Sequence, residues 1–213
     1  NMSAIPDQIY LYRITHIDNL DHILVKNKIT CPNHPEKDPR YINIGDTTLI
    51  GNRKETPINI APGGTFSDYV AFYLGARPPM LYNIQNGFQG VTKRKPEDII
   101  YLVSSFAEVR KTGSPFIFTD GHAYHLMSQF FNHEDHFNEV DWQAVNLKKW
   151  NDTEDDPDRK RRKQTEFLVY QELPFPAIVA IIVYDDAAKS KVLTKFDEAG
   201  IAQNIVVKPS WYY

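Results

Sequence analysis

The sequence lacks the features that secreted and membrane-embedded proteins need. Its one cysteine, Cys31, cannot form a disulfide within the chain, so nothing indicates an oxidising compartment and we expect a cytoplasmic protein. The first residues hold no basic segment followed by an apolar one, and no apolar run approaches the ~18 residues of a membrane helix. We therefore expect no membrane partner. Asn1 before Met2 resembles a cloning remnant, and residues 1–5 are expected to be partly tag or disordered.

An excess of positive charge is also missing. The chain has 24 Lys and Arg against 27 Asp and Glu, a formal net charge of -3 and a pI near 6.2. Non-specific affinity for nucleic acid depends on Lys and Arg side chains that neutralise phosphates. Any contact with DNA or RNA must therefore be local, and Arg77, residues 93–95 and the basic run 159–163 are the candidates.

Several common catalytic motifs are absent as well. The sequence has no Walker A loop, no G-x-G-x-x-G and no G-x-S-x-G, and Gly63-Gly64 alone predicts only a turn. The densest histidine cluster is His122, His125, His133 and His136, but no Cys pair or H-E-x-x-H motif accompanies it, so we expect no metal site. A metal-dependent nuclease is disfavoured too, because no lysine closely follows the carboxylate of Glu166.

The hydrophobic pattern predicts one α+β domain over residues 1–213, since 42% hydrophobic residues can bury one substantial core. Strands are predicted at 10–14, 98–103, 115–119, 166–171, 178–184 and 205–207. Helices are predicted at 17–25, 106–111 and 187–199, the first capped by Thr15, and weaker helical patterns occur around 124–131 and 142–150. Residues 69–74 fit a strand or a short helix. Residues 30–64 are too long for an ordinary connector, which indicates a functional or mobile segment.

Glu166 is the strongest single candidate for catalysis. It opens an apolar strand directly after the basic run 159–163, so the pattern places a carboxylate at a strand start beside a cationic loop. The alternative is a solvated surface glutamate, which is the commoner situation for this residue type. An aromatic content of 13% also suits a ligand cleft or a nucleobase platform, although most such rings belong to the core.

Several segments, in this order, make the chain resemble the DarT family of DNA ADP-ribosyltransferase toxins. The matching segments are residues 12–20 with Ile23 and Leu24, Gly63-Gly64 with 68–70, Phe72-Tyr73, Arg77-Pro78 with Met80-Leu81, 102–105, 116–120, 166–170 and 211–213. The resemblance covers nearly the whole chain. It implies an ADP-ribosyltransferase-like fold, in which central mixed β-sheets pack with helices around an NAD cleft.

The same resemblance implies an activity and its partners. Members of the family transfer ADP-ribose from NAD to a thymine base in single-stranded DNA, and an antitoxin, DarG, removes the mark with its macrodomain. It therefore implies NAD as co-substrate, single-stranded DNA as acceptor and a DarG-type macrodomain protein as partner. An acceptor base must be unstacked to be reached, which would explain a preference for single strands.

Individual residues take their expected roles from this resemblance. Glu166 and Arg53 occupy the catalytic positions, and Arg53 also contacts NAD. The other NAD contacts implied are Arg13, Ile14, Thr15, His22, Thr30 and Tyr73, and the candidate DNA contacts are Arg77, Met80, His122 and Arg162. Residues 36–53 match the NAD-binding element, and residues 122–166 match the substrate-reading loop.

The chain departs from the family at several positions. Arg13 stands where relatives often carry His, and Ala71, Leu74, Ala76 and Pro79 differ from the second motif, which leaves the flanking sequence open. Transfer to guanine, to RNA or to a protein therefore remains an alternative, as does a noncatalytic nucleic-acid-binding module.

Asp46 places a carboxylate in a loop expected to face two polyanions. We hypothesise that it attenuates activity by like-charge repulsion, the alternative being a solvent-facing turn residue.

Overall fold

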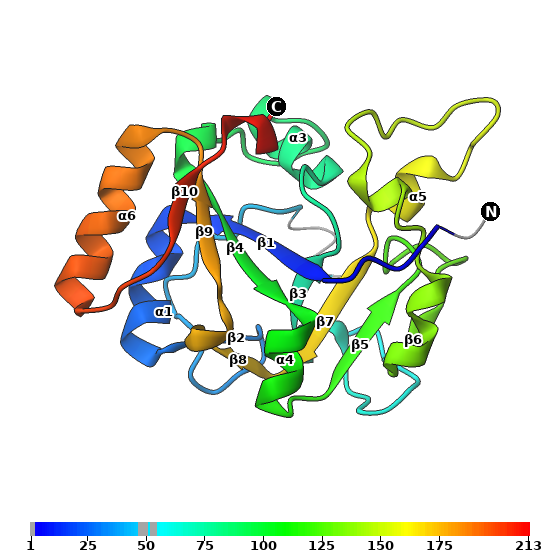
Figure 1. Cartoon of the computed structure of the whole chain (residues 1–213), viewed down its shortest axis with the longest axis horizontal. Helices are drawn as coiled ribbons and strands as arrows, with labels where there is room; N and C mark the ends of the chain where they lie inside the picture. The colour runs from blue at the N-terminus through cyan, green and yellow to red at the C-terminus, as the bar shows by residue number, and fades with distance from the viewer. Residues whose placement is uncertain (1–2, 47–50, 52–54) are drawn as a thin grey trace.

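The computed structural model describes residues 3–46, 51 and 55–213. Within this part of the chain, eight strands form one mixed sheet in the order β10-β9-β4-β1-β3-β7-β5-β6, and β2 pairs with β8 beside it. Neighbouring strands are antiparallel except β9 and β10, which run parallel. Figure 1 shows these strands crossing the centre of the molecule.

The elements have the following bounds. The large sheet consists of β1 (Tyr10–His16), β3 (Tyr69–Tyr73), β4 (Ile99–Ser105), β5 (Phe116–Thr119), β6 (Phe130–Phe131), β7 (Glu166–Tyr170), β9 (Ala180–Val183) and β10 (Ile205–Val207). The small sheet pairs β2 (Lys28–Thr30) with β8 (Glu172–Pro174). The α-helices are α1 (Leu20–Lys26), α3 (Pro79–Asn86), α4 (Phe106–Thr112), α5 (Arg159–Lys163) and α6 (Asp186–Ala199). None of the helices in the described ranges has the length and apolar character that a membrane crossing requires.

Apolar side chains form one large core on one face of the sheet and two separate clusters on the other. The large core joins alternate strand residues such as Leu11, Phe72 and Phe167 to α1, α4 and α6. Helices α1 and α6 pack together at one side of the molecule (Figure 1). On the opposite face, one cluster surrounds Tyr101 beneath α3 and the other surrounds Leu168. This division leaves room for a cleft between the two clusters.

The pairing between neighbouring strands is sparsest in the middle of the sheet, between β1 and β3. Strand β1 pairs with β4 along its whole length, from Tyr10 to His16, and β3 pairs with β7 at every residue. Between β1 and β3 the described pairing is a single position, Tyr12 opposite Tyr73. The two strands therefore diverge, and the Arg13 guanidinium crosses the opening to donate a hydrogen bond to the Ala71 carbonyl (3.0 Å).

Most predicted strands and helices are confirmed, with boundaries shifted by a few residues. The alternatives at 69–74 are resolved as strand β3. The helix predicted at 187–199 is α6, capped by Asp185, whose side chain accepts a hydrogen bond from the Ala188 N–H. The turn predicted at 106–111 is α4, which Ser105 caps in the same way. These segments carry their own start signals, so local sequence was sufficient.

Other predictions were wrong. His16, not Thr15, caps the first helical segment, because its Nδ1 accepts the Asp18 N–H while Thr15 accepts the Asn19 side-chain amide. The helices suggested around 124–131 and 142–150 are absent, and these segments form turns, β6 and short 3-10 turns instead. Aromatic residues of these segments pack individually against the core: Phe131, for example, stacks on Phe118 with a centroid distance of 5.4 Å. Strands β2 and β8 and helix α3 were not predicted.

A buried lysine joins the β3–α3 connection to the long segment before β7. The Lys163 side chain is 1% exposed, and its ammonium donates to the carbonyls of Ala76 (2.7 Å) and Val145 (2.6 Å). Burial, assisted by the nearby Arg77 charge, lowers the pKa of Lys163 from 10.5 to about 8. Gly75 completes this junction, because a Cβ there would collide with the Val145 carbonyl.

We expect Gly75→Ala to destabilise the fold, since the Val145 backbone would have to move to admit the methyl group. The loss should be about 3 kcal/mol of unfolding free energy, at the upper end for overpacking. Gly113→Ala is the matched control: open space surrounds its Cβ position and only its positive φ opposes the change, at a cost of about 1 kcal/mol. Urea unfolding of both variants measures the difference, and equal losses would contradict the predicted collision.

The lowered pKa of Lys163 predicts a pH dependence of stability. Lys163 loses its proton above about pH 8 in the folded state, whereas in the unfolded chain it keeps the proton up to its ordinary pKa of 10.5. Between these two values the unfolded state binds more protons than the folded state, so the free energy of unfolding increases as pH rises. From about pH 8 to about pH 10, the wild type should gain about 2 kcal/mol relative to Lys163→Met. Urea unfolding of both proteins across this range is the measurement. Parallel stability curves for the two proteins would show that the buried amine is not perturbed.

Candidate functional site

A cavity of about 200 Å³ lies in the cleft between the two separate apolar clusters. Six of its lining residues were predicted as site residues: Arg13, Ile14, Tyr73, Met80, His122 and Glu166. Other lining residues come from the loop after β2, the turn before β3 and β3 itself, among them Pro32, Tyr41, Asp46, Phe66, Ser67 and Tyr69. The structure therefore gathers around one cavity residues that are far apart in the sequence.

Glu166 is fixed at the start of β7 by hydrogen bonds to both its backbone and its carboxylate. The carboxylate is nearly buried, with the residue 4% exposed, and its Oε2 accepts the Ala123 N–H at 3.1 Å. The backbone N–H of Glu166 donates to the Thr119 hydroxyl, which comes from β5 (3.1 Å). Register places Tyr73 directly opposite Glu166. A buried carboxylate held by a backbone donor is pre-oriented for a cation that develops in the cavity.

Arg13 and Tyr41 form the boundary between this cavity and a second one. Besides bonding Ala71, Arg13 donates from Nη2 to the Tyr41 hydroxyl (3.3 Å). That hydroxyl also lies 3.4 Å from the Thr15 Oγ1. Because Arg13 retains further N–H groups and lines both cavities, its charge can serve an anionic ligand that extends from one to the other.

The second cavity, of about 370 Å³, gathers three further residues that were predicted to contact NAD. Thr15, His22 and Thr30 line it together with Arg13. His22 on α1 donates from Nε2 to the Glu36 carbonyl (2.8 Å), which fixes the loop after β2 above the helix. The two cavities share Arg13, Pro32, Tyr41 and Asn43, and their combined size is in the range of small-molecule sites.

Asn19 holds the other end of that loop. Its side chain donates to the Ile42 carbonyl (2.9 Å) and accepts the Ile42 N–H (2.9 Å). The same amide bonds the Thr15 hydroxyl at 3.0 Å. One buried side chain thus connects β1 to the cavity wall at residues 41–43.

Residues of α3, α5 and the turn after β5 form a third cavity. It shares Asp46, Met80, His122 and Tyr124 with the first cavity and extends to Lys160, Arg161 and Gln164. It therefore leads from Glu166 towards α5, and it places Met80 and His122 at the junction of the two spaces. Asp46 lines both cavities.

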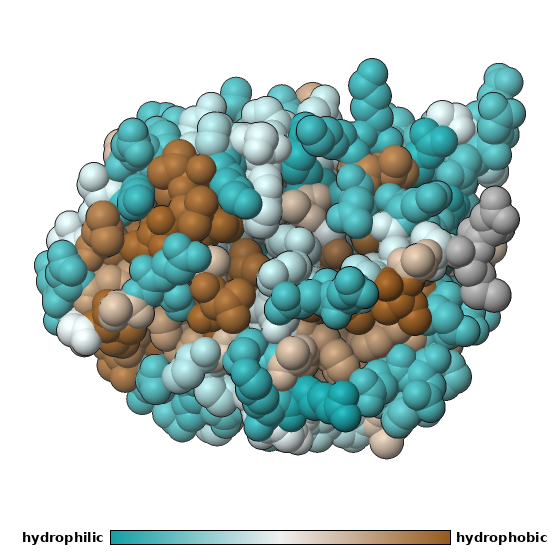
Figure 2. Space-filling model, viewed as in Figure 1, coloured by the Kyte–Doolittle hydropathy of each residue, from teal (hydrophilic) through white to brown (hydrophobic). Residues whose placement is uncertain are grey.

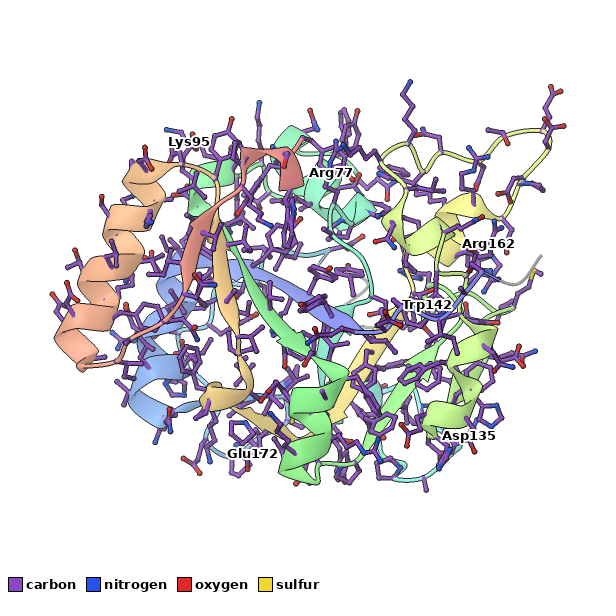
Figure 3. The ribbon with its side chains drawn as sticks, viewed as in Figure 1. Arg77, Lys95, Asp135, Trp142, Arg162 and Glu172 are labelled. Atoms are coloured by element: carbon purple, nitrogen blue, oxygen red, sulfur yellow. The ribbon has the colours of Figure 1, made fainter. Side chains whose placement is uncertain are left out.

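Arg77 and Arg162, both predicted to contact DNA, do not line any of these three cavities. Arg77 has a left-handed backbone (φ 53°) and lies over the Tyr213 ring, 4.4 Å from its centroid. Figure 3 shows it beside α3, well away from Arg162 near α5.

Arg162 pairs with carboxylates of the protein itself. Its guanidinium bonds Asp156 through both terminal nitrogens (2.7 and 2.8 Å) and Asp141 through Nε (2.9 Å). These hydrogen bonds hold the pKa of Asp156 well below its usual range. Its charge is compensated within the protein, so a DNA phosphate at Arg162 would have to compete with these carboxylates.

Arg53, the second predicted catalytic residue, lies outside the described residues. The metal hypothesis for the histidines has no support in the described ranges, where no three or more His, Cys, Asp or Glu side chains gather as an ion site.

Sequence reasoning missed Tyr41, Asn19 and Tyr124 as cavity or loop-fixing residues. Tyr41 is an isolated aromatic residue in a segment rich in Pro, Asp and Asn, and that contrast is the only signal in the sequence. Asn19 gave no signal of its loop-fixing role, because the partners that fix the loop are the backbone groups of Ile42.

Comparison with known proteins agrees with this arrangement. The family described as "ssDNA thymidine ADP-ribosyltransferase, DarT" matches residues 12–213. A DNA ADP-ribosyl transferase of Thermus sp. strain 2.9 is 36% identical over 98% of both chains, and one of Escherichia coli O127:H6 is 32% identical over 98% of this chain and 95% of its own. A relative in Thermosipho africanus, 25% identical over 95% of this chain, is a fusion of a DNA ADP-ribosyl transferase and a DNA ADP-ribosyl glycohydrolase; this chain spans 49% of it.

Solved structures show the same similarity. Thermus sp. 2.9 DarT in complex with ADP-ribosylated single-stranded DNA matches with a TM-score of 0.92, 32% identity and full coverage of both chains. The same protein in complex with NAD+ matches with a TM-score of 0.85 and 33% identity. The chain belongs to the DarT family of single-stranded DNA thymidine ADP-ribosyltransferases.

Proposed function

We propose that this chain transfers ADP-ribose from NAD to a thymine base of single-stranded DNA and releases nicotinamide. The observation that carries the proposal is the buried Glu166 carboxylate in a cavity that adjoins, across Arg13, a second cavity lined by the other expected NAD contacts. Family membership supports the same reaction. No metal takes part in the proposed reaction.

Glu166 supplies the chemistry that this reaction needs. When the bond between ribose and nicotinamide breaks, its electron pair leaves with nicotinamide and positive charge develops on the ribose. A fixed carboxylate stabilises this charge more in the transition state than in the ground state. The thymine nitrogen then bonds the ribose carbon and releases its proton to water, a step in which we propose that Arg53 assists.

The two cavities suit the two halves of NAD. Arg13 lines both, so its guanidinium can pair with the pyrophosphate that connects them. Thr15, His22 and Thr30 in the second cavity are proposed to contact the adenosine half. Ile14 and Tyr73 in the first are proposed to contact the nicotinamide half.

DNA is proposed to approach through the third cavity. Met80 and His122 lie where it opens into the first, so they can contact the base that reaches Glu166. Arg77 is half-buried over the Tyr213 ring and remains a candidate for a phosphate contact. The glycohydrolase fused to the Thermosipho relative supports a DarG-type macrodomain protein as the partner that reverses the mark.

We further propose that residues 1–213 act as one catalytic domain in the cytoplasm. Strands from both ends of the chain belong to the same sheet, and the C-terminal Tyr213 donates its hydroxyl to the Arg77 carbonyl (2.6 Å), which supports one unit. NAD and DNA are both present in the cytoplasm.

Glu166→Gln should abolish transfer while leaving the fold intact, because the amide oxygen can still accept the Ala123 N–H. We expect turnover to fall roughly 1,000-fold, as for loss of a principal electrostatic group. The measurement is the intact mass of a thymine-containing single-stranded oligonucleotide after incubation with NAD. Glu108→Gln, on α4 and paired with Lys111, is the control that should retain activity.

Parallel oligonucleotides identify the acceptor. A thymine-free DNA strand should gain no mass, and neither should a guanine-only strand or RNA. Mass gain on those strands would redirect the proposal to another base or nucleic acid. Equal activity of Glu166→Gln and the wild type would overturn the role of the carboxylate.

Asp46→Gly should raise activity, since Asp46 lines both cavities that are proposed to receive polyanions. Two like charges at contact distance in water repel each other by about 1 kcal/mol. Removing the carboxylate should therefore raise kcat/KM roughly fivefold. Asp46→Asn removes the charge without adding the backbone freedom of glycine, so it should give most of the same rise in kcat/KM. Equal turnover of the wild type and both variants on one oligonucleotide would rule out attenuation.

A further inference from the structure

We propose that Arg161 is a positioning residue for the reaction: it holds the turn at residues 120–128 so that the Ala123 N–H orients the Glu166 carboxylate. This inference rests on the proposed function of Glu166. Arg161 is the neighbour of Arg162 in the basic run 159–163.

Arg161 is the centre of a hydrogen-bonded network between two distant parts of the chain. Its Nε and Nη2 bond the two carboxylate oxygens of Asp158 (2.6 and 2.8 Å), and its Nη1 bonds Asp120 (3.2 Å) and Ser128 (3.1 Å). Its backbone carbonyl accepts the His122 N–H at 2.9 Å. The side chain is 11% exposed, so it serves these partners rather than solvent.

The turn fits closely against the guanidinium. Gly121 lies directly beneath it, and a Cβ at this position would collide with Arg161 Nη1. Asp120 also accepts the Gln129 N–H (2.9 Å), and Ser128 donates to the His122 carbonyl (2.7 Å). Both ends of the turn are thus fixed through groups that contact Arg161.

Two residues after Gly121, the turn reaches the catalytic carboxylate. The Ala123 N–H donates to Glu166 Oε2 at 3.1 Å, in a buried position. A shift of the turn would therefore move the donor that sets the direction of the carboxylate. Misplacement of a reacting group by ~1 Å can cost on the order of 100-fold in rate.

The position of Arg161 also distinguishes it from its neighbours. Lys160 lies over the Trp150 ring (5.5 Å to its centroid), and Arg162 pairs with Asp156 and Asp141. Neither of them has a described hydrogen bond to the turn at 120–128. Arg161 alone among these three connects α5 to the carboxylate, and α5 lies in a mostly hydrophilic part of the surface (Figure 2).

Two variants test the role by different means. Arg161→Gln removes the network, whereas Gly121→Ala displaces the guanidinium without changing any charge. Both should lower kcat roughly 10- to 100-fold and leave KM for NAD within about twofold, because the second cavity is untouched. Arg161→Lys should recover part of the loss, since it restores the charge but not the forked geometry.

The control is Arg110→Gln, which breaks an exposed ion pair to Glu134 remote from the cavities and should keep kcat unchanged. A parallel readout that needs no activity is amide hydrogen exchange at Ala123. Both Arg161→Gln and Gly121→Ala should accelerate it, whereas Arg110→Gln should not.

The outcomes separate this inference from the proposed function. Unchanged Ala123 exchange, unchanged kcat, or a loss that appears mainly in KM for NAD would overturn the positioning role. A wild-type protein that modifies no oligonucleotide would instead overturn the proposed function, while the exchange experiment would still decide whether Arg161 holds the turn.

Discussion

The incomplete pairing of β1 with β3 is the constraint on which the site depends. If these strands paired along their length, the sheet would be closed and no cleft would separate the two apolar clusters of that face. Where the strands diverge, their facing backbone N–H and C=O groups need other hydrogen-bond partners. Arg13 is such a partner, because its guanidinium donates to the Ala71 carbonyl. The same arginine is therefore a structural bridge and the charged wall of both cavities.

The cavity walls are positioned by buried polar side chains that act on backbone groups. Asn19 fixes Ile42 through two hydrogen bonds, and Lys163 joins the Ala76 and Val145 carbonyls. Such contacts are directional and costly to leave unmade, so they define one geometry for loops that have little apolar surface of their own. The irregular segments around Glu166 can thus be as well defined as the sheet.

Elements and site residues could be predicted from the sequence where neighbouring residues in the chain determine them. Strands such as β4 and β7 are uninterrupted apolar runs, and α6 begins at its own Asp185 cap, so both were predictable. Strand β2 is too short to show a pattern, and the first turn of α3 contains Pro79, which a helix interior would exclude. Family resemblance predicted Glu166 as a site residue, and the structure places it in the wall of the first cavity. The roles of Tyr41 and Asn19 could not be predicted, because the contacts that define them, Tyr41 with Arg13 and Asn19 with Ile42, join residues far apart in the sequence.

The ion pairs of α5 have a consequence for how the protein meets its polymer substrate. Arg161 and Arg162 form ion pairs with Asp120, Asp141, Asp156 and Asp158. The most basic stretch of the sequence therefore offers few free cations to a phosphate backbone. The logarithm of DNA affinity falls with the logarithm of salt concentration in proportion to the phosphates neutralised. Helix α5 therefore adds little to the salt dependence of DNA binding, which leaves phosphate contacts to cations elsewhere, such as Arg77 and residues 93–95.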